Sequence, residues 1–153
     1  MAIAVQATMG HSFRFMRAAR RDPELRDPAR AYLEKVGLSS RAERPAGTLA
    51  HGEQRQLELA MALASKPQLL LLDEPMAGLG GQESQEMVSL LRTLKGTVAI
   101  LMVEHDMSAV FALADRITVL VYGKIIATGT PEDIQTNAAV RGAYLGARAD
   151  APA

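Results

Sequence analysis

The chain has 153 residues, the size of one ordinary domain, and 48% of them are hydrophobic, which allows a sizeable core and excludes global disorder. It contains no cysteine, which excludes a disulfide framework, a thiolate metal site and a catalytic thiol, and fits a reducing compartment. Its 17 basic and 17 acidic side chains give a formal net charge of zero.

The charge is distributed unevenly along the chain. Residues 1–45 carry nine Lys and Arg against five Asp and Glu, whereas residues 46–153 carry eight against twelve. Because the basic excess is modest and acidic residues are interspersed, it favours a solvated or protein-facing surface, and no nucleic acid partner is expected. The longest strongly apolar run, 97–103, is too short to span a bilayer, and residues 1–9 lack the basic start of a signal peptide. We therefore expect a soluble, cytoplasmic protein.

The amino-terminal part of the chain is predicted to be helical. Residues 1–21 suit one or two helices. Pro28 is placed to open a further helix that runs to Val36, where Gly37 ends it. A connection over residues 41–47 follows, so this part contributes no predicted strand.

The next predicted helix, from about residue 53 to 65, begins beside a glycine. Its apolar side chains recur at helical spacing: Leu57, Ala60, Met61 and Ala64. Gly52 has no side chain, so the backbone there can approach a ligand closely. The free N–H groups and the positive dipole end of a helix start suit a phosphate. This segment is therefore a candidate anion site.

Four consecutive leucines, Leu69–Leu72, predict a short strand that is buried on both faces of a parallel sheet. The strand ends in two carboxylates, Asp73 and Glu74, at the position where open α/β sheets place their ligands. Asp73 suits a hydrated Mg²⁺, and Glu74 could orient or deprotonate a water molecule. The alternative is a strand that simply ends in a solvated acidic turn, the usual fate of a lone Asp-Glu pair.

The remaining chain alternates helices and strands. Helices are expected over 82–94, from the cap Asp106 to Ala114, from Thr130 and Pro131 onward, and over 138–145. Strands are expected over 97–103, 117–121 and 124–128, the last two as a hairpin around Gly123. The order strand, helix, strand, helix, strand predicts an α/β fold with parallel crossovers.

Three features in this order resemble the nucleotide-binding subunits of ATP-binding cassette (ABC) transporters. They are the helix start His51-Gly52-Glu53, the carboxylate pair Asp73-Glu74, and His105 after the next buried strand. Within this family, the chain is most similar to the ATPase subunits of branched-chain amino acid importers. The segments that carry this similarity are LAHGEQRQLELAMALA, LLLLDEPMAGLG, VEHDM and VRGAYLG. The resemblance covers residues 2–147, and several ordered motifs together are far more specific than any one of them.

The resemblance implies a role for each matching residue. Asp73 corresponds to the Walker B residue that holds Mg²⁺, Glu74 to the catalytic carboxylate and His105 to the switch histidine, so Glu74 and His105 are the catalytic candidates. The implied cofactor is ATP with Mg²⁺. Residues 49–54 correspond to the family's signature segment and residues 77–80 to its D-loop. Nucleotide contacts are implied for Ala50, His51, Gly52 and Glu53 of the signature segment and for Gly78 and Leu79 of the D-loop.

Two departures from the family pattern bear on activity. Ala50 and His51 stand where the family's signature usually has Ser and Gly, which removes a hydroxyl that would contact the γ-phosphate. A P-loop needs Gly-x-x-x-x-Gly-Lys-Ser/Thr, and none of the four lysines of these 153 residues is followed by Ser or Thr. The chain therefore resembles the carboxyl-terminal portion of a transporter ATPase that lacks Walker A, and we expect it to be inactive by itself.

The predicted elements and the resemblance together define the expected fold and domains. The fold class is α/β, a partial P-loop NTPase with a mostly parallel sheet flanked by helices, an amino-terminal helical segment and a carboxyl-terminal helix. The expected domains are a helical segment over 1–48, half of an ABC ATPase core over 49–129, and a carboxyl-terminal extension over 130–153.

The resemblance also implies a function and partners. The implied function is that of an ATP-hydrolysing subunit of an importer of branched-chain amino acids or a similar small solute. The implied partners are a second ATPase subunit, paired head to tail, and membrane permease subunits, which would place the protein on the inner face of the cell membrane. The alternative is a non-catalytic module that completes a partner's ATP site or docks on a permease.

Overall fold

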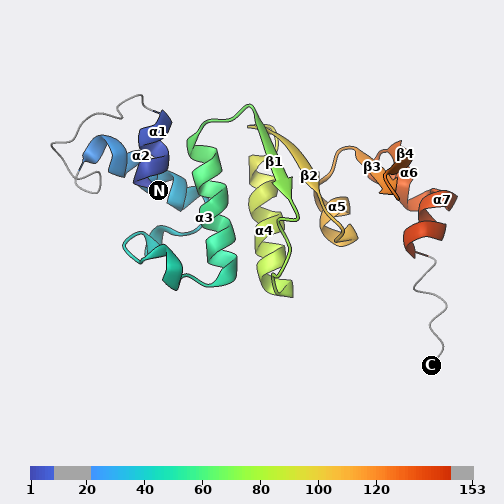
Figure 1. Cartoon of the computed structure of the whole chain (residues 1–153), viewed down its shortest axis with the longest axis horizontal. Coiled ribbons are helices and arrows are strands. Elements are labelled where there is room, and N and C mark those ends of the chain that lie inside the picture. The colour runs from blue at the N-terminus through green and yellow to red at the C-terminus, as the bar shows by residue number, and fades with distance from the viewer. Residues whose placement is uncertain (9–21, 146–153) are drawn as a thin grey trace. The chain divides into compact units, whose positions relative to one another are not determined.

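The computed structural model describes residues 1–8 and 22–145, so residues 9–21 of the helical stretch expected over 1–21 and the last residues of the extension expected over 130–153 lie outside the described residues. The chain divides into two compact units, Met1–Glu104 and His105–Ala153 (Figure 1). The expected domain boundaries at residues 48 and 129 stay a prediction. No helix among the described residues combines the length and the apolar composition that crossing a membrane requires.

Three helices pack together at the start of the first unit. They are α1 (Ala2–Thr8), α2 (Pro23–Lys35) and α3 (His51–Ala64), and two short 3₁₀ turns, η2 (Ser39–Arg41) and η3 (Ala46–Thr48), connect α2 to α3. Their shared core is apolar and buried, and it consists of Val5, Leu25, Ala29 and Ala64. The prediction that this part is helical is confirmed for the described residues.

The start of α2 differs from the predicted one. Asp22 caps the helix, because its Oδ1 accepts a hydrogen bond of 3.1 Å from the N–H of Glu24, and Pro23 occupies the first turn. Pro28, which we expected to open the helix, lies inside it. The sequence offers two Asp-Pro starts, Asp22-Pro23 and Asp27-Pro28, and the prediction was wrong because the helix begins at the earlier one and continues through the later one.

Strands β1 (Leu69–Asp73) and β2 (Ala99–Val103) form a parallel pair, connected through α4 (Gly81–Leu94). Leu69 lies opposite Ala99 and Asp73 opposite Val103, so both strands end at the same edge. This confirms the two predicted strands and the parallel crossover between them. In Figure 1, β1 crosses in front of α4, and β2 runs beside β1 within this unit.

Only one face of this sheet is covered among the described residues. Leu70 is buried, as are the α4 side chains Met87 and Leu91. On the opposite face, Leu71 is 67% exposed and Leu101 is 60% exposed. The prediction of a strand buried on both faces is therefore wrong for this structure, because α4 shields one side of the pleat only.

The second unit consists of short elements around its own core. They are α5 (Met107–Leu113), β3 (Ile117–Val121), β4 (Lys124–Gly129), α6 (Pro131–Thr136), α7 (Ala138–Val140) and a π-helical turn, η4 (Arg141–Leu145). The buried side chains at its centre are Ile117, Val119, Ile134 and Val140. The predicted caps are confirmed: Asp106 accepts from the N–H groups of Ser108 and Ala109, and Thr130 accepts from the N–H of Asp133.

The third strand corrects the predicted sheet. β3 pairs with β4 in an antiparallel hairpin whose turn residues, Tyr122 and Gly123, both have positive φ, as a tight two-residue hairpin turn requires. β3 therefore does not extend the β1–β2 pair. The fold class is mixed α/β and mostly helical, with one small parallel and one small antiparallel sheet.

Candidate functional site

Asp73 and Glu74 lie at the carboxyl end of β1, and both side chains are exposed. Glu74 has a φ of +45°, which is uncommon for a residue other than glycine and is often found at functional sites. Its backbone N–H donates a hydrogen bond of 2.9 Å to the carbonyl of Val103, at the end of β2. The turn that carries the two carboxylates is therefore fixed to the neighbouring strand.

A second bond holds the loop that follows Glu74. The N–H of Met76 donates a 2.9 Å hydrogen bond to Oε1 of Glu104, the residue after β2. Met76 itself is buried. Sequence reasoning missed Glu104, although its position as a carboxylate directly after the second strand was a signal for it. The ends of β1 and β2 are thus joined twice, once through the backbone and once through a side chain.

The exposed carboxylate of Asp73 has the chemistry to hold the Mg²⁺ that the resemblance implies. Oxygen ligands of this kind suit a hard cation that keeps most of its shell as water and phosphate. Within the described residues, no group of three or more His, Cys, Asp or Glu side chains forms a protein-only metal site. A single carboxylate at the strand end suits a metal ion whose other ligands are phosphate oxygens and water. The carboxylate of Asp73 is therefore a suitable ligand for Mg²⁺.

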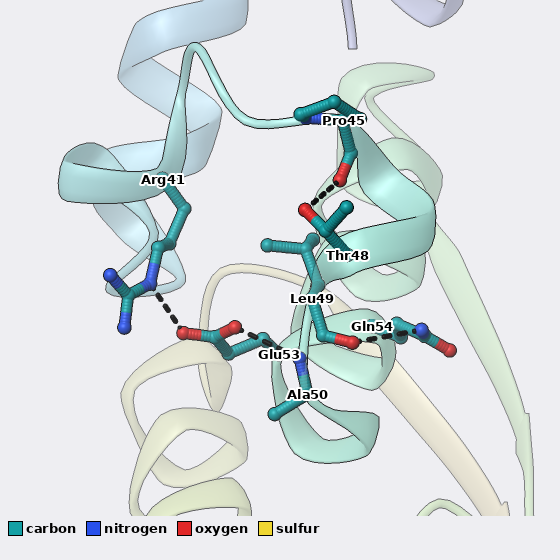
Figure 2. A network of polar contacts seen from close by, with 7 residues as sticks. All are labelled: Arg41, Pro45, Thr48, Leu49, Ala50, Glu53 and Gln54. Carbon is teal, nitrogen blue, oxygen red and sulfur yellow. Dashed lines mark hydrogen bonds and ion pairs between the residues drawn. The ribbon is translucent and has the colours of Figure 1, made fainter.

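The start of α3 is held by a polar network (Figure 2). The N-cap residue, Ala50, has no side-chain acceptor, and its own N–H donates a 3.0 Å hydrogen bond to Oε2 of Glu53. Oε1 of Glu53 accepts a hydrogen bond of 2.6 Å from Nε of Arg41. The amide of Gln54 donates to the carbonyl of Leu49 at 3.0 Å. Both carboxylate oxygens of Glu53 therefore have partners within the chain.

The hydrogen bond from Arg41 is the main reason that the pKa of Glu53 lies below its ordinary value, and the bond from the Ala50 N–H adds to the shift. A lowered folded-state pKa means that the folded form favours the charged carboxylate. The resulting stabilisation is fully present above the ordinary pKa of about 4.5 and is lost as the pH falls through the lower folded value. Arg41, which sequence reasoning did not single out, thus supports the signature segment from 12 residues away.

We expect Arg41→Ala to raise the pKa of Glu53 towards its ordinary value, because the largest cause of the lowering is removed. An NMR titration of the side-chain carboxyl carbons measures this directly. Asp133 is the internal control: its pKa is lowered by bonds from Thr130, so Arg41→Ala leaves it unchanged. An unchanged titration of Glu53 in this variant contradicts the role assigned to Arg41.

The structure brings the signature segment and the D-loop together. Gly78 has a φ of +76°, and a Cβ atom added there would lie 3.0 Å from Nε2 of His51. A Cβ atom added to Gly52 would lie 2.8 Å from Oε1 of Glu83, in the first turn of α4. We expected a ligand to approach the backbone of Gly52 closely, and in this structure the side chain of Glu83 does so. Contact between Gly52 and a nucleotide stays a prediction.

The other predicted site residues lie as follows. Leu79 is half-buried beside Gly78 in the D-loop. His105 is exposed and opens the second unit, directly before the N-cap Asp106. Its predicted action together with Glu74 stays a prediction.

Comparison with known proteins places the chain in a family. A family model described as ABC transporter matches residues 3–77, and one described as branched-chain amino acid ATP-binding cassette transporter matches residues 124–150. The high-affinity branched-chain amino acid transport ATP-binding protein LivG of Escherichia coli is 43% identical over 129 residues. The chain belongs to the ABC transporter ATP-binding proteins of the branched-chain amino acid type.

The matches cover most of this chain but only about half of each relative. The match to LivG covers 83% of this chain and 51% of LivG, and BraF of Pseudomonas aeruginosa gives the same identity and coverage. This ABC protein chain therefore spans about half the length of the curated relatives it matches. The activity, substrates and partners of a whole transporter ATPase are accordingly proposals for it.

Solved structures show the cassette fold. An ATP-binding cassette of an ABC transporter superimposes with a TM-score of 0.73 at 27% identity, covering 81% of this chain and 51% of that chain. The ADP conformation of such a cassette gives a TM-score of 0.75 at 22% identity, covering 95% and 61%. The predicted ABC ATPase fold is thereby confirmed at the level of the cassette, with the sheet corrections described above.

Proposed function

We propose that this chain provides the Walker B and signature part of an ATP-hydrolysing subunit that powers import of branched-chain amino acids or a similar small solute. The observation that carries the proposal is the β1–β2 edge. There, two parallel strands end together, and a turn anchored at Val103 presents the Asp73 and Glu74 carboxylates to solvent. The identity to LivG and BraF supports the solute class.

In this proposal each site residue has one task. Bound Mg²⁺ would neutralise charge on the ATP phosphates. The carboxylate of Asp73 would hold that ion, and Glu74 would accept a proton from the attacking water and orient it. His105 would contact the γ-phosphate as its charge shifts. The start of α3, where Ala50 and His51 are exposed, would offer backbone N–H groups to a phosphate.

The remaining site residues serve a paired subunit in this proposal. Ala50, His51, Gly52 and Glu53, with Gly78 and Leu79 of the D-loop, would face ATP bound by a second ATPase subunit arranged head to tail. The net-basic residues 1–45 would face a membrane permease, which places the protein at the inner face of the cell membrane. No nucleic acid partner is proposed, and the 153-residue chain by itself is proposed to be inactive.

The domain division completes the proposal. Residues 1–48 would form the helical segment, 49–129 the ATPase core half and 130–153 the extension of the branched-chain type. The match of the branched-chain family model to residues 124–150 supports the last of these.

A chimera tests the function. We expect Escherichia coli LivG to retain leucine uptake and Mg²⁺-dependent ATP turnover when this chain replaces the segment that it matches, because the catalytic and signature residues are then supplied by this sequence. Uptake is measured in a strain that lacks LivG, and unmodified LivG is the positive control. A folded chimera that binds its permease and ATP but neither hydrolyses nor transports contradicts the enzymatic role and leaves the non-catalytic module.

A further inference from the structure

Five residues lie where the start of α3 approaches the D-loop and the first turn of α4 within the first unit. They are His51, Gly52, Gly78, Gly80 and Glu83, and we refer to them as the α3–D-loop latch. We propose that the latch makes the signature segment and the D-loop move as one body, with His51 and Glu83 as positioning residues. The functional consequence rests on the proposed function, whereas the mechanical coupling does not.

The first half of the latch is the contact between His51 and Gly78. His51 is the first residue of α3, and its Nε2 and Cδ2 atoms lie 3.0 and 3.4 Å from the position of a Cβ atom on Gly78. A side chain at residue 78 would therefore crowd the imidazole ring, which would have to shift by a few tenths of an ångström, and the φ of +76° would strain the backbone of that residue. Glycine allows the imidazole to lie directly against the D-loop backbone.

The second half runs through one carboxylate. Oε2 of Glu83 accepts a 3.0 Å hydrogen bond from the N–H of Gly80, the N-cap residue of α4. Oε1 of the same side chain lies 2.8 Å from the position of a Cβ atom on Gly52, which is buried. Glu83 thus caps its own helix while its other oxygen occupies the space that the missing side chain of Gly52 leaves. A methyl group at residue 52 would therefore require a shift of the Glu83 carboxylate, whose other oxygen accepts the bond from Gly80.

Both linked segments are proposed to face the same bound nucleotide. A rigid connection between them would keep the helix start that receives phosphate in register with the D-loop, and well-held geometry is what positional catalysis needs. Movement of either segment would be passed to the other through these contacts. The α3–D-loop latch therefore adds a link within one subunit to the contacts proposed between subunits.

Amide NMR and hydrogen exchange on the 153-residue chain without nucleotide test the coupling. Gly52→Ala should accelerate exchange of the Gly80 amide by about tenfold, because that amide loses its acceptor. Gly81→Ala is the matched control: it also adds a methyl group in the first turn of a helix, but nothing lies within 4 Å of its Cβ position. His51→Ala should shift the Gly78 amide signal and leave that of Gly47 unchanged.

A double variant separates positioning from general damage. In a Glu83→Ala background, Gly52→Ala should cause no further change at Gly80, because the displaced carboxylate is absent. An effect of Gly52→Ala that persists in this background, or a Gly80 response no larger than that of Gly81→Ala, overturns the proposal. If Gly52→Ala fails to fold, an unshifted Gly78 amide in His51→Ala overturns it instead. A chain that shows the coupling but whose LivG chimera neither hydrolyses ATP nor transports contradicts the proposed function alone.

Discussion

Glu74→Gln in the LivG chimera should lower steady-state ATP turnover by about 10²–10⁴, roughly 3–5 kcal/mol of barrier, because a positioned general base is worth that much. The substitution keeps the size and shape of the side chain and removes its ability to accept a proton. The backbone bond from Glu74 to Val103 does not depend on the side chain, so the turn should survive. Nucleotide binding should therefore remain nearly unchanged while turnover falls.

Two further variants sharpen this test. Asp73→Asn should weaken the Mg²⁺-dependent part of nucleotide binding, because a neutral amide is a poorer ligand for a hard cation. Glu86→Gln is the matched control, since it removes an exposed carboxylate on α4 whose bond is to the nearby Gln82 side chain. Phosphate release and fluorescent nucleotide binding measure the two effects separately. Near-full turnover in Glu74→Gln contradicts the role proposed for Glu74.

The exposed face of the β1–β2 sheet should make the purified 153-residue chain self-associate, because parallel sheets are normally covered on both faces. Four side chains contribute to this face: Leu69, Leu71, Leu101 and Val103, each at least half exposed. Burying one leucine stabilises an interface by about 2 kcal/mol, which corresponds to about thirtyfold in affinity. Leu71→Ser and Leu101→Ser should therefore each weaken association by about that factor.

A matched control comes from the other unit. Ile125 on β4 is 67% exposed, the same fraction as Leu71, so Ile125→Ser removes an equally exposed apolar side chain from the other sheet. Sedimentation velocity over a concentration series measures the association constants. If Ile125→Ser weakens association as much as Leu71→Ser, the sheet face is not the surface that associates. A chain that stays monomeric at all concentrations contradicts the prediction as a whole.

Local signals in the sequence predicted most of the elements. Asp106 and Thr130 cap helices through hydrogen bonds to residues two or three positions away, so their effect depends on neighbouring sequence only. The hairpin turn at Gly123 is local in the same way. The parallel arrangement of the two apolar strands also followed from the sequence, because a helix of suitable length separates them. These features placed Asp73 and Glu74 at a strand end correctly.

Contacts between distant residues were decided only by the tertiary structure. Glu104 reaches Met76 across 28 residues and Arg41 reaches Glu53 across 12, and no spacing rule links such pairs. The exposure of Leu71 depends on which helices cover the sheet, which the four leucines by themselves cannot specify. The approach of His51 to Gly78 likewise needs both backbones in place. The sequence by itself determined the elements, the family and the candidate residues, because caps, turns and strand patterns act over short spans; the supports of the site came from packing, because they join residues far apart in the chain.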